Sequence, residues 1–356
     1  MDSDEELREP LETWQVVLIL IPLCTITVWI VLSNSFVMLA VLCQRSMRTP
    51  PNVYLASLAT ADFLVGTLIL PFNILQIVKN HWMFSEELCK TWLTLDVTLS
   101  TLSIFHLIAI AVDRYRAVSD GVTYVLNRTI HDVMSVVICL WILCLWISTP
   151  PVLGWGDWND LKLNEKFICD YSTTFGYVLH SAFGSFIFPM ILMIVIYRKI
   201  FKKIKQKFIE RATVPSIQNS LDRELSETET SGDLLRTNRE TKKVKRINNS
   251  SRPTSQIQEF MTKKIRFSLT KERRAARTLG IIIGAFMICW VPFCIMYILR
   301  PKTGDPPIVI YHLLTWLGYL NSAVNPIIYC IYSKDFKRAF NRLVCRCKRN
   351  RNSRVF

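Results

Sequence analysis

A carboxylate and several hydroxyl groups stand inside stretches of this chain that are otherwise apolar. Asp96 and Ser100 are four residues apart, and Ser181 and Ser185 repeat that spacing further along. Residues at i and i+4 lie on one face of a helix, so each pair would point in a single direction. A carboxylate can pair with an ammonium group, and hydroxyls can bond to the hydroxyls of a polar ring. The two pairs together indicate a site for a small organic cation with a polar ring.

Aromatic residues at helical spacing could line the same site. One stripe follows i, i+3, i+4, i+7 and consists of Trp290, Phe293, Cys294 and Tyr297. Trp316 and Tyr319 share a face of a later stretch. Aromatic faces attract a cation by about 0.5–2 kcal/mol, yet such a stripe alone favours plain helix packing. The ligand interpretation therefore depends on Asp96, for which no Lys or Arg in the apolar stretches offers itself as a structural partner.

Seven apolar stretches must position these residues. They cover residues 15–42, 53–78, 91–112, 133–153, 174–197, 278–299 and 307–332. At a rise of about 1.5 Å per residue, each can cross about 30 Å of hydrocarbon as a helix. The chain is 51% hydrophobic and only 20% charged, less charge than the roughly 25% of soluble domains. We predict an all-α membrane protein, a seven-transmembrane helix bundle.

The net charge of +15 comes mainly from two segments. Residues 198–277 and 334–354 hold 31 of the 43 Lys and Arg residues. Such loops stay on the cytoplasmic side, so we expect a multi-pass protein of the plasma membrane with its C-terminus in the cytoplasm and its N-terminus outside. The basic residues flank apolar spans instead of lying among them in a soluble fold, which argues against nucleic-acid binding.

Composition divides the chain into three parts. We predict an extracellular N-terminus over residues 1–14, a membrane domain over 15–332, and a tail over 333–356 that begins with a short amphipathic helix. Residues 208–262 are polar and poor in apolar side chains, which is typical of a mostly disordered loop. The absence of an evident internal repeat gives no support to a transporter built from repeated halves.

Short motifs follow one another along the seven stretches. They are Asn34 within Ser-Asn-Ser-Phe-Val, Leu58-Ala59-Thr60-Ala61-Asp62, Cys89, Asp113-Arg114-Tyr115, Trp141, Pro189 with Tyr197, Cys289-Trp290-Val291-Pro292 and Asn325-Pro326-Ile327-Ile328-Tyr329. One such motif is weak evidence, but the whole set, each on its proper stretch, is specific. The chain thereby resembles rhodopsin-like (class A) G-protein-coupled receptors, and among them the aminergic receptors, over all seven stretches and the tail helix.

The resemblance implies a site for a biogenic amine near the outer end of the bundle. Asp96, seven residues after Cys89, would pair with the protonated amine, and Ser181 and Ser185 would bond ring hydroxyls. Cys89 and Cys169 would form a disulfide. The ligand residues that the resemblance implies are Asp96, Val97, Ser100, Ser181, Ala182, Ser185, Trp290, Phe293, Cys294, Tyr297, Trp316 and Tyr319.

The resemblance also implies an allosteric sodium ion and no other cofactor. The residues at the matching positions are Asp62, Ser103, Asn321, Ser322 and Asn325. By analogy, sodium bound there would stabilise the inactive state of the receptor.

Activation is implied at the inner end. The residues at the matching positions are Asp113, Arg114, Tyr115, Tyr197, Glu272, Pro292, Pro326 and Tyr329. Charge pairs of Arg114 with Asp113 and Glu272 would keep the cytoplasmic face closed. Outward movement of the sixth span about Pro292 would open it to a heterotrimeric G protein, because proline permits a kink.

Further partners are implied by the family and by the tail. Arrestin and receptor kinases are expected, with phosphorylation in the Ser/Thr-rich segment 213–255. Cys345 and Cys347 follow an amphipathic stretch, Lys334–Val344, and are candidates for palmitoylation, which would add contact with membrane lipid.

Several alternatives stay open at this point. The run Ala275–Ile282 looks like receptors for tyramine, octopamine and serotonin that inhibit adenylate cyclase, so we favour tyramine or octopamine, then serotonin or dopamine. A peptide or orphan receptor of the same fold is the nearest rival. A retinal protein would need lysine at Tyr319, and no span holds a nucleophile–base pair or metal cluster that would indicate an enzyme. Cys294 and His106 depart from the residues common in the family.

Overall fold

The computed structural model describes residues 13–150, 162–163, 166–207, 280–332 and 336–339, with isolated positions 153, 209, 277, 341 and 342. The chain forms two compact units, one from residues 1–197 and 278–356 and the other from 198–277. Several predictions lie outside the described residues, namely those for residues 1–12, for the loop 208–262 except position 209, and for Glu272, Cys345 and Cys347. They stay predictions.

The first unit is almost entirely helical where it is described. Its first half consists of α1 (Thr13–Cys43), η1 (Arg45–Met47), α2 (Pro50–Leu64), η2 (Val65–Ile69), α3 (Leu70–Lys79), α4 (Glu86–Ser119), α5 (Val122–Asn127) and α6 (Ile130–Ser148). Its second half holds an antiparallel hairpin of β1 (Lys162–Leu163) and β2 (Lys166–Phe167), then α7 (Phe175–Ala182), η4 (Phe183–Ile187) and α10 (Ile308–Tyr332). The two-residue strands are a small addition to the predicted all-α fold.

The seven predicted spans coincide with helices. Six spans of the described chain are long and apolar enough to cross a membrane, including span five (Phe175–Lys207), which begins with α7 and η4, and span six (Gly280–Thr303). The seventh is α10, which has 25 residues. Its Asn321, Ser322 and Asn325 interrupt the apolar run of this helix. The architecture is the predicted seven-helix bundle.

Local sequence explains where several helices begin and end. Ser85 caps α4 by accepting a hydrogen bond from the Leu88 N–H at 3.3 Å. Thr129 and Asp132 form a reciprocal capping box at the start of α6. The prediction that the fourth span runs to residue 153 was wrong, because α6 ends at Ser148. Pro150 disfavours helical geometry in the residue before it and so stops the helix early.

Two spans contain a short π-helical segment. η2 precedes α3, whose first turn holds Pro71, and η4 precedes Pro189. Proline has no N–H for the carbonyl four residues earlier, and the wider π-turn accommodates that loss. The segment η4 matters for function because Ser185 lies inside it.

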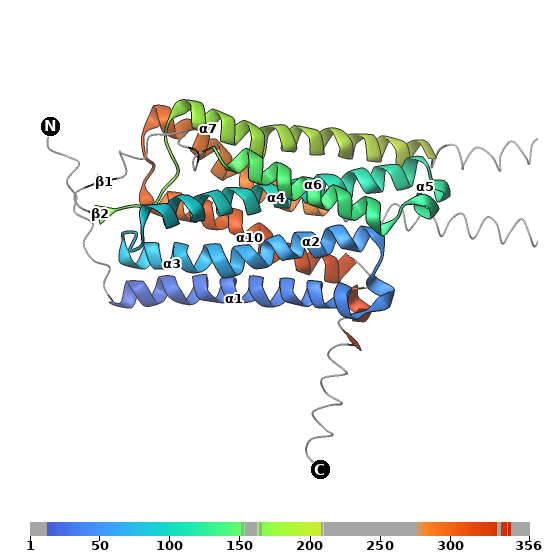
Figure 1. Cartoon of the computed structure of the whole chain (residues 1–356), viewed down its shortest axis with the longest axis horizontal. Coiled ribbons are helices and arrows are strands. Elements are labelled where there is room, and N and C mark those ends of the chain that lie inside the picture. The colour runs from blue at the N-terminus through green and yellow to red at the C-terminus, as the bar shows by residue number, and fades with distance from the viewer. Residues whose placement is uncertain are drawn as a thin grey trace, which may run out of the picture. The chain divides into compact units, whose positions relative to one another are not determined.

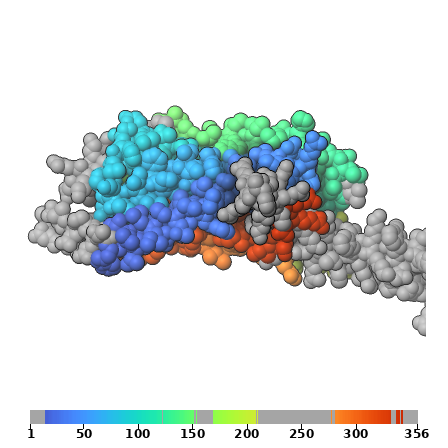
Figure 2. Space-filling model, turned by 90° about the horizontal axis from the view of Figure 1, so that it is seen from below, coloured from blue at the N-terminus to red at the C-terminus, as the bar shows by residue number. Residues whose placement is uncertain are grey.

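α4 is the central helix of the bundle. It packs against α2 and α6, while α1 packs against α2 and α10, as Figure 1 shows. In the most apolar 18-residue stretch of each helix, 78% of the residues of α4 are buried, but only 6% of those of α1. Leu18 and Leu32 of α1 are 62% and 63% exposed. Figure 2 shows α1, in dark blue, at the surface of the molecule. Exposed leucines on a spanning helix face lipid, whereas the polar residues of α4 point into the protein.

Candidate functional site

Asp96 lies buried in α4, and its two carboxylate oxygens differ in the hydrogen bonds that they accept from the described residues. The residue is 2% exposed. Its Oδ2 accepts hydrogen bonds from the hydroxyls of Tyr171 at 2.5 Å and Tyr319 at 2.7 Å. Its Oδ1 is buried and accepts none from the described residues. A buried acceptor without a donor is costly, so Asp96 is arranged to receive one more donor.

Aromatic rings gather beside this carboxylate. The ring of Tyr171 meets those of Phe293 and Tyr297 edge-on, with centroids 6.4 and 5.9 Å apart. Phe293 stacks on Tyr297 at 6.0 Å and stands perpendicular to Trp290 at 5.8 Å. Phe186, from η4, lies 5.3 Å from Trp290. The predicted span-six stripe is therefore assembled around Tyr171, which holds it next to Asp96.

The span-five hydroxyls are buried as well. Ser185 is fully buried, and its Oγ has no hydrogen-bond partner among the described residues. Ser181 and Ala182, one helical turn earlier, are buried too. η4 packs against α4, so Ser185 belongs to a segment that contacts the helix carrying Asp96. The hydroxyl of Ser185 is thus, like Asp96 Oδ1, a buried polar group without a hydrogen-bond partner among the described residues.

The span-seven aromatic pair is fixed by contacts with other helices. The indole of Trp316 donates to Asn73 Oδ1 at 2.9 Å and stands perpendicular to Tyr319. A Cβ built on Gly318 would come within 2.9 Å of the Trp290 ring, so only glycine permits this approach of α10 to span six. The other predicted ligand residues are half-buried or buried and comprise Val97, Ser100 and Cys294.

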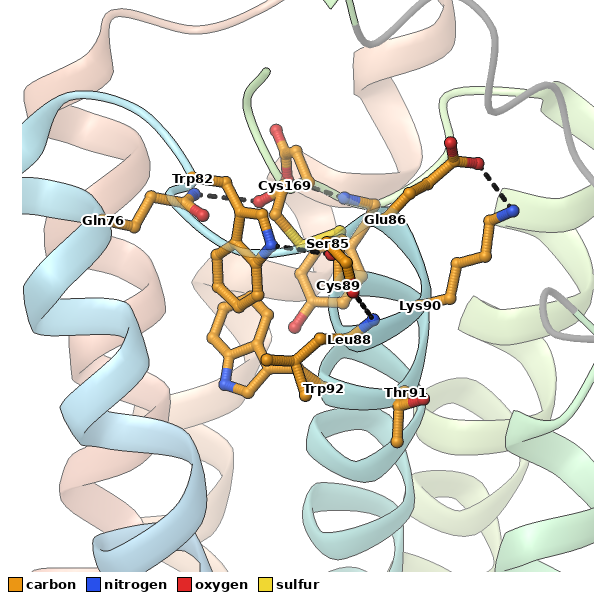
Figure 3. The surroundings of a disulfide bond; sticks show 12 residues. Gln76, Trp82, Ser85, Glu86, Leu88, Cys89, Lys90, Thr91, Trp92 and Cys169 are labelled. Carbon is orange, nitrogen blue, oxygen red and sulfur yellow. Dashed lines mark hydrogen bonds and ion pairs between the residues drawn. A yellow bond between two sulfur atoms is a disulfide. The ribbon is translucent and has the colours of Figure 1, made fainter. Parts of the chain in front are cut away.

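A disulfide ties the loop that carries Tyr171 to the start of α4. Cys89 and Cys169 are bonded, as predicted, and Gln76 of α3 donates to the Cys169 carbonyl at 2.8 Å. Figure 3 shows the bond with Trp82, whose indole donates to the Ser85 carbonyl. Because Cys89 lies fewer than two helical turns before Asp96, this bond confines the loop close to the carboxylate.

Ionic contacts hold the same loop to spans six and seven. The carboxylate of Asp170 accepts from Arg300 Nη2 at 2.7 Å and from the Tyr311 hydroxyl at 2.6 Å. Arg300 also donates to Asp305 at 2.6 Å. Burial, and then the negative charge of Asp96, raises the pKa of Tyr171 above its ordinary value. The phenol therefore stays protonated and acts as a donor.

A second buried carboxylate, Asp62, has donors on both oxygens. Ser103 at 3.2 Å and Ser322 at 2.8 Å donate to Oδ1, and Asn325 at 3.0 Å donates to Oδ2. Asn321, the fifth predicted residue of this set, is buried in α10. Carboxylate and hydroxyl oxygens are the donors that hard cations prefer. The residues fit a sodium ion, which Asp62, Ser103 and Ser322 would hold and which would neutralise the carboxylate.

At the other end of α4, Asp113 pairs with a loop residue. Arg128 Nη1 donates to both carboxylate oxygens at 2.5 and 2.6 Å, and the Tyr124 hydroxyl donates at 3.1 Å. Asp113 forms no ion pair with Arg114 in the described chain, so the predicted pairing of these neighbours is corrected. Adjacent helical residues point in different directions.

The remaining activation residues lie on different elements. A Cβ on Gly280 would reach within 3.0 Å of the Tyr197 ring, so these two residues are in close contact. The ring of Tyr329 contacts Phe336 at 6.0 Å. Tyr115 is half-buried in α4, while Pro292 and Pro326 lie within span six and α10.

Sequence reasoning missed the residues that complete the Asp96 site. They are Tyr171, Asp170, Arg300, Tyr311 and Asn73. One signal was available: Tyr171 comes two residues after Cys169, and the implied disulfide places that cysteine near Asp96. The ionic partners of Asp170 depend on how three distant segments meet, which spacing along the chain does not reveal.

Comparisons with known proteins agree with this arrangement. Residues 33–329 match the family described as 7 transmembrane receptor (rhodopsin family). The Probable G-protein coupled receptor No18 of Amphibalanus amphitrite is 38% identical, covering 98% of this chain and 93% of that protein. Tyramine receptor 1 of Locusta migratoria is 32% identical, with 95% and 91% covered, and 5-hydroxytryptamine receptor 1F of Mus musculus is 35% identical, with 88% and 89% covered. The chain belongs to the rhodopsin family of seven-transmembrane receptors.

Proposed function

We propose that this chain is a G-protein-coupled receptor for a biogenic amine, whose protonated nitrogen pairs with Asp96. The observation that carries the proposal is the buried Oδ1 of Asp96, which accepts no hydrogen bond from the described residues. An ammonium group supplies both the missing donor and the opposite charge. Its family consists of receptors and not of enzymes.

The other end of the ligand is proposed to carry a ring hydroxyl. Ser185 Oγ is another buried polar atom without a hydrogen-bond partner among the described residues, and the rings of Phe293 and Trp290 would enclose the aromatic group. Tyramine or octopamine fits this chemistry, and a tyramine receptor is among the relatives. Serotonin and dopamine are the alternatives, and a serotonin receptor is also a relative.

Signalling is proposed to follow from a shift between two states. The amine would bind more tightly to the state in which span six has moved outward about Pro292, and only that difference in affinity can drive activation. The opened face would bind a heterotrimeric G protein, with inhibition of adenylate cyclase as the expected result. We also propose that the receptor lies in the plasma membrane, with its N-terminus extracellular and its C-terminus cytoplasmic, because its basic segments would stay on the cytoplasmic side.

The regulatory partners remain part of the proposal. A sodium ion beside Asp62 would favour the inactive state. The hydroxyl oxygens of Ser103 and Ser322 beside that carboxylate support this part of the proposal. Receptor kinases would phosphorylate the segment 213–255, and arrestin would bind the phosphorylated form. Palmitoyl groups on Cys345 and Cys347 would insert into the membrane lipid. No nucleic-acid partner is proposed.

The test is cyclic AMP in transfected cells, with and without forskolin. Tyramine, octopamine, dopamine, serotonin and histamine are applied to the wild type and to Asp96→Asn, which removes the charge and keeps the side-chain size. Glu86→Gln is the matched control, because Glu86 lies on the same helix and pairs only at the surface with Lys90. A response to one amine that is lost in Asp96→Asn and kept in Glu86→Gln supports the proposal.

Silence of the wild type to all five amines leads to a calcium readout. Silence there as well, with surface expression confirmed by antibody labelling, contradicts an amine ligand. The peptide or orphan alternative would then be preferred, with the fold unaffected.

A further inference from the structure

The Asp96 site is closed on one side by a residue of the disulfide loop. Tyr171 places its hydroxyl on Asp96 Oδ2 and its ring against Phe293 and Tyr297. Tyr319 occupies the same oxygen from α10. Two phenol side chains therefore crowd the carboxylate, and only Oδ1 is left for a ligand.

We propose that Tyr171 is a specificity-determining residue of this site, which admits primary ammonium groups and disfavours amines whose nitrogen carries methyl groups. The inference rests on the proposed amine function and deepens it. A primary ammonium needs little space to donate to Oδ1. Each N-methyl group adds volume and removes an N–H, and it would have to fit beside the Tyr171 ring, which is packed edge-on against two other rings.

The loop is built to hold Tyr171 in this position. The preceding residue, Asp170, is bound to both Arg300 of span six and Tyr311 of α10. Arg300 is 8% exposed, so this ion pair is shielded from screening by salt. On the other side, Cys169 is fixed by the disulfide and by Gln76. Tyr171 thus stands between two anchored neighbours and cannot withdraw unless one of them is released.

The experiment compares amines that differ only at nitrogen. Tyramine, N-methyltyramine and N,N-dimethyltyramine are assayed on each variant by cyclic AMP, beside serotonin and its N,N-dimethyl derivative. The measured quantity is the ratio of EC50 for the dimethyl amine to that for the primary amine. Because both ligands act on the same variant, receptor expression cancels in this ratio.

The wild type is expected to disfavour the dimethyl amine by at least about tenfold, the discrimination that one or two extra carbon groups produce in a closed site. In Tyr171→Ala the ratio should fall to within about threefold of unity, because the ring is gone. Tyr171→Phe keeps the ring contacts and should keep most of the discrimination. Asp170→Asn should lower the ratio by weakening the anchor of the loop.

Asp305→Asn is the matched control for the anchor. Asp305 pairs with the same arginine, but its side chain is 72% exposed and it is not part of the disulfide loop. The EC50 ratio of Asp305→Asn should therefore equal that of the wild type. An unchanged ratio in Tyr171→Ala, or a change in Asp305→Asn as large as in Asp170→Asn, would overturn the inference. A wild type that responds to no primary amine would instead refute the proposed function, and this inference with it.

Discussion

Asp62 and Asp96 are two carboxylates buried in the same helix bundle, and they are satisfied in different ways. Asp62 has donors on both oxygens, from α4 and α10. Asp96 has two donors on Oδ2 and none from the described residues on Oδ1. Both oxygens of Asp62 therefore accept hydrogen bonds from the protein, whereas Asp96 Oδ1 accepts none from the described residues. The difference suggests that the Asp96 site is made for a molecule from outside.

α10 is the element that both carboxylates share. Tyr319 donates to Asp96, and Ser322 and Asn325 donate to Asp62. A small displacement of this helix would therefore change both donor sets together. This gives a direct physical route by which an ion at one carboxylate can alter ligand affinity at the other.

The largest expected difference between the two carboxylates is in amine potency. We expect Asp96→Asn to raise the EC50 of the active amine by at least about 100-fold, because it removes the charge that pairs with a buried ammonium. Asp62→Asn should change the EC50 by less than about tenfold, since it lies outside the proposed ligand contacts. Concentration–response curves on receptors matched for surface expression measure both. An equal loss of amine potency in the two variants would contradict the proposal that Asp96, and not Asp62, binds the amine.

The second prediction tests α10 as the shared element. Gly318→Ala puts a methyl group within 2.9 Å of Trp290, and the resulting overpacking should destabilise the receptor by about 1–3 kcal/mol. The melting temperature of the detergent-solubilised protein measures this loss. Gly284→Ala is the control, because a Cβ there meets nothing within 4 Å; it should be neutral or stabilising. If Gly318→Ala is neutral as well, α10 has the freedom to move without affecting Trp290.

The sequence predicted more of the Asp62 site than of the Asp96 site. All three donors to Asp62 were among the residues that the family resemblance implied. For Asp96, the sequence predicted Tyr319 but missed Tyr171, which comes from a loop whose path depends on the Cys89–Cys169 bond. The transmembrane spans can be predicted from the sequence because a helix that crosses the hydrocarbon core of a bilayer must be long and apolar. Contacts made by loops depend on tertiary structure and cannot be predicted from short sequence patterns.

The same limit applies at the end of α4. Asp113 and Arg114 are neighbours in sequence, which suggested a pair, but the structure pairs Asp113 with Arg128 from beyond α5. The π-segment η4 is a further example. The sequence indicated Ser185 as a ligand residue but did not predict that it lies in a π-helical segment.

The third prediction concerns sodium. Replacing choline by sodium at constant ionic strength should raise the inhibition constant (Ki) of the agonist at the wild type by about fivefold, the lower range of allosteric coupling. In Asp62→Asn the effect should vanish, since a neutral amide cannot replace the carboxylate charge. The measurement is agonist competition binding in membranes. A sodium effect that survives in Asp62→Asn would place the ion elsewhere.

The smallest expected effect concerns Ser185, whose buried hydroxyl has no hydrogen-bond partner among the described residues. Ser185→Ala should weaken a ligand that carries a ring hydroxyl by about 3–10-fold, the value of one hydrogen bond. Phenethylamine, which lacks that hydroxyl, should bind both forms equally. Because Ser185 Oγ bonds to no described residue, the substitution should not lower the melting temperature, and this separates loss of a ligand contact from loss of structure. Equal weakening of both ligands would show that Ser185 supports packing and does not bond the ring hydroxyl.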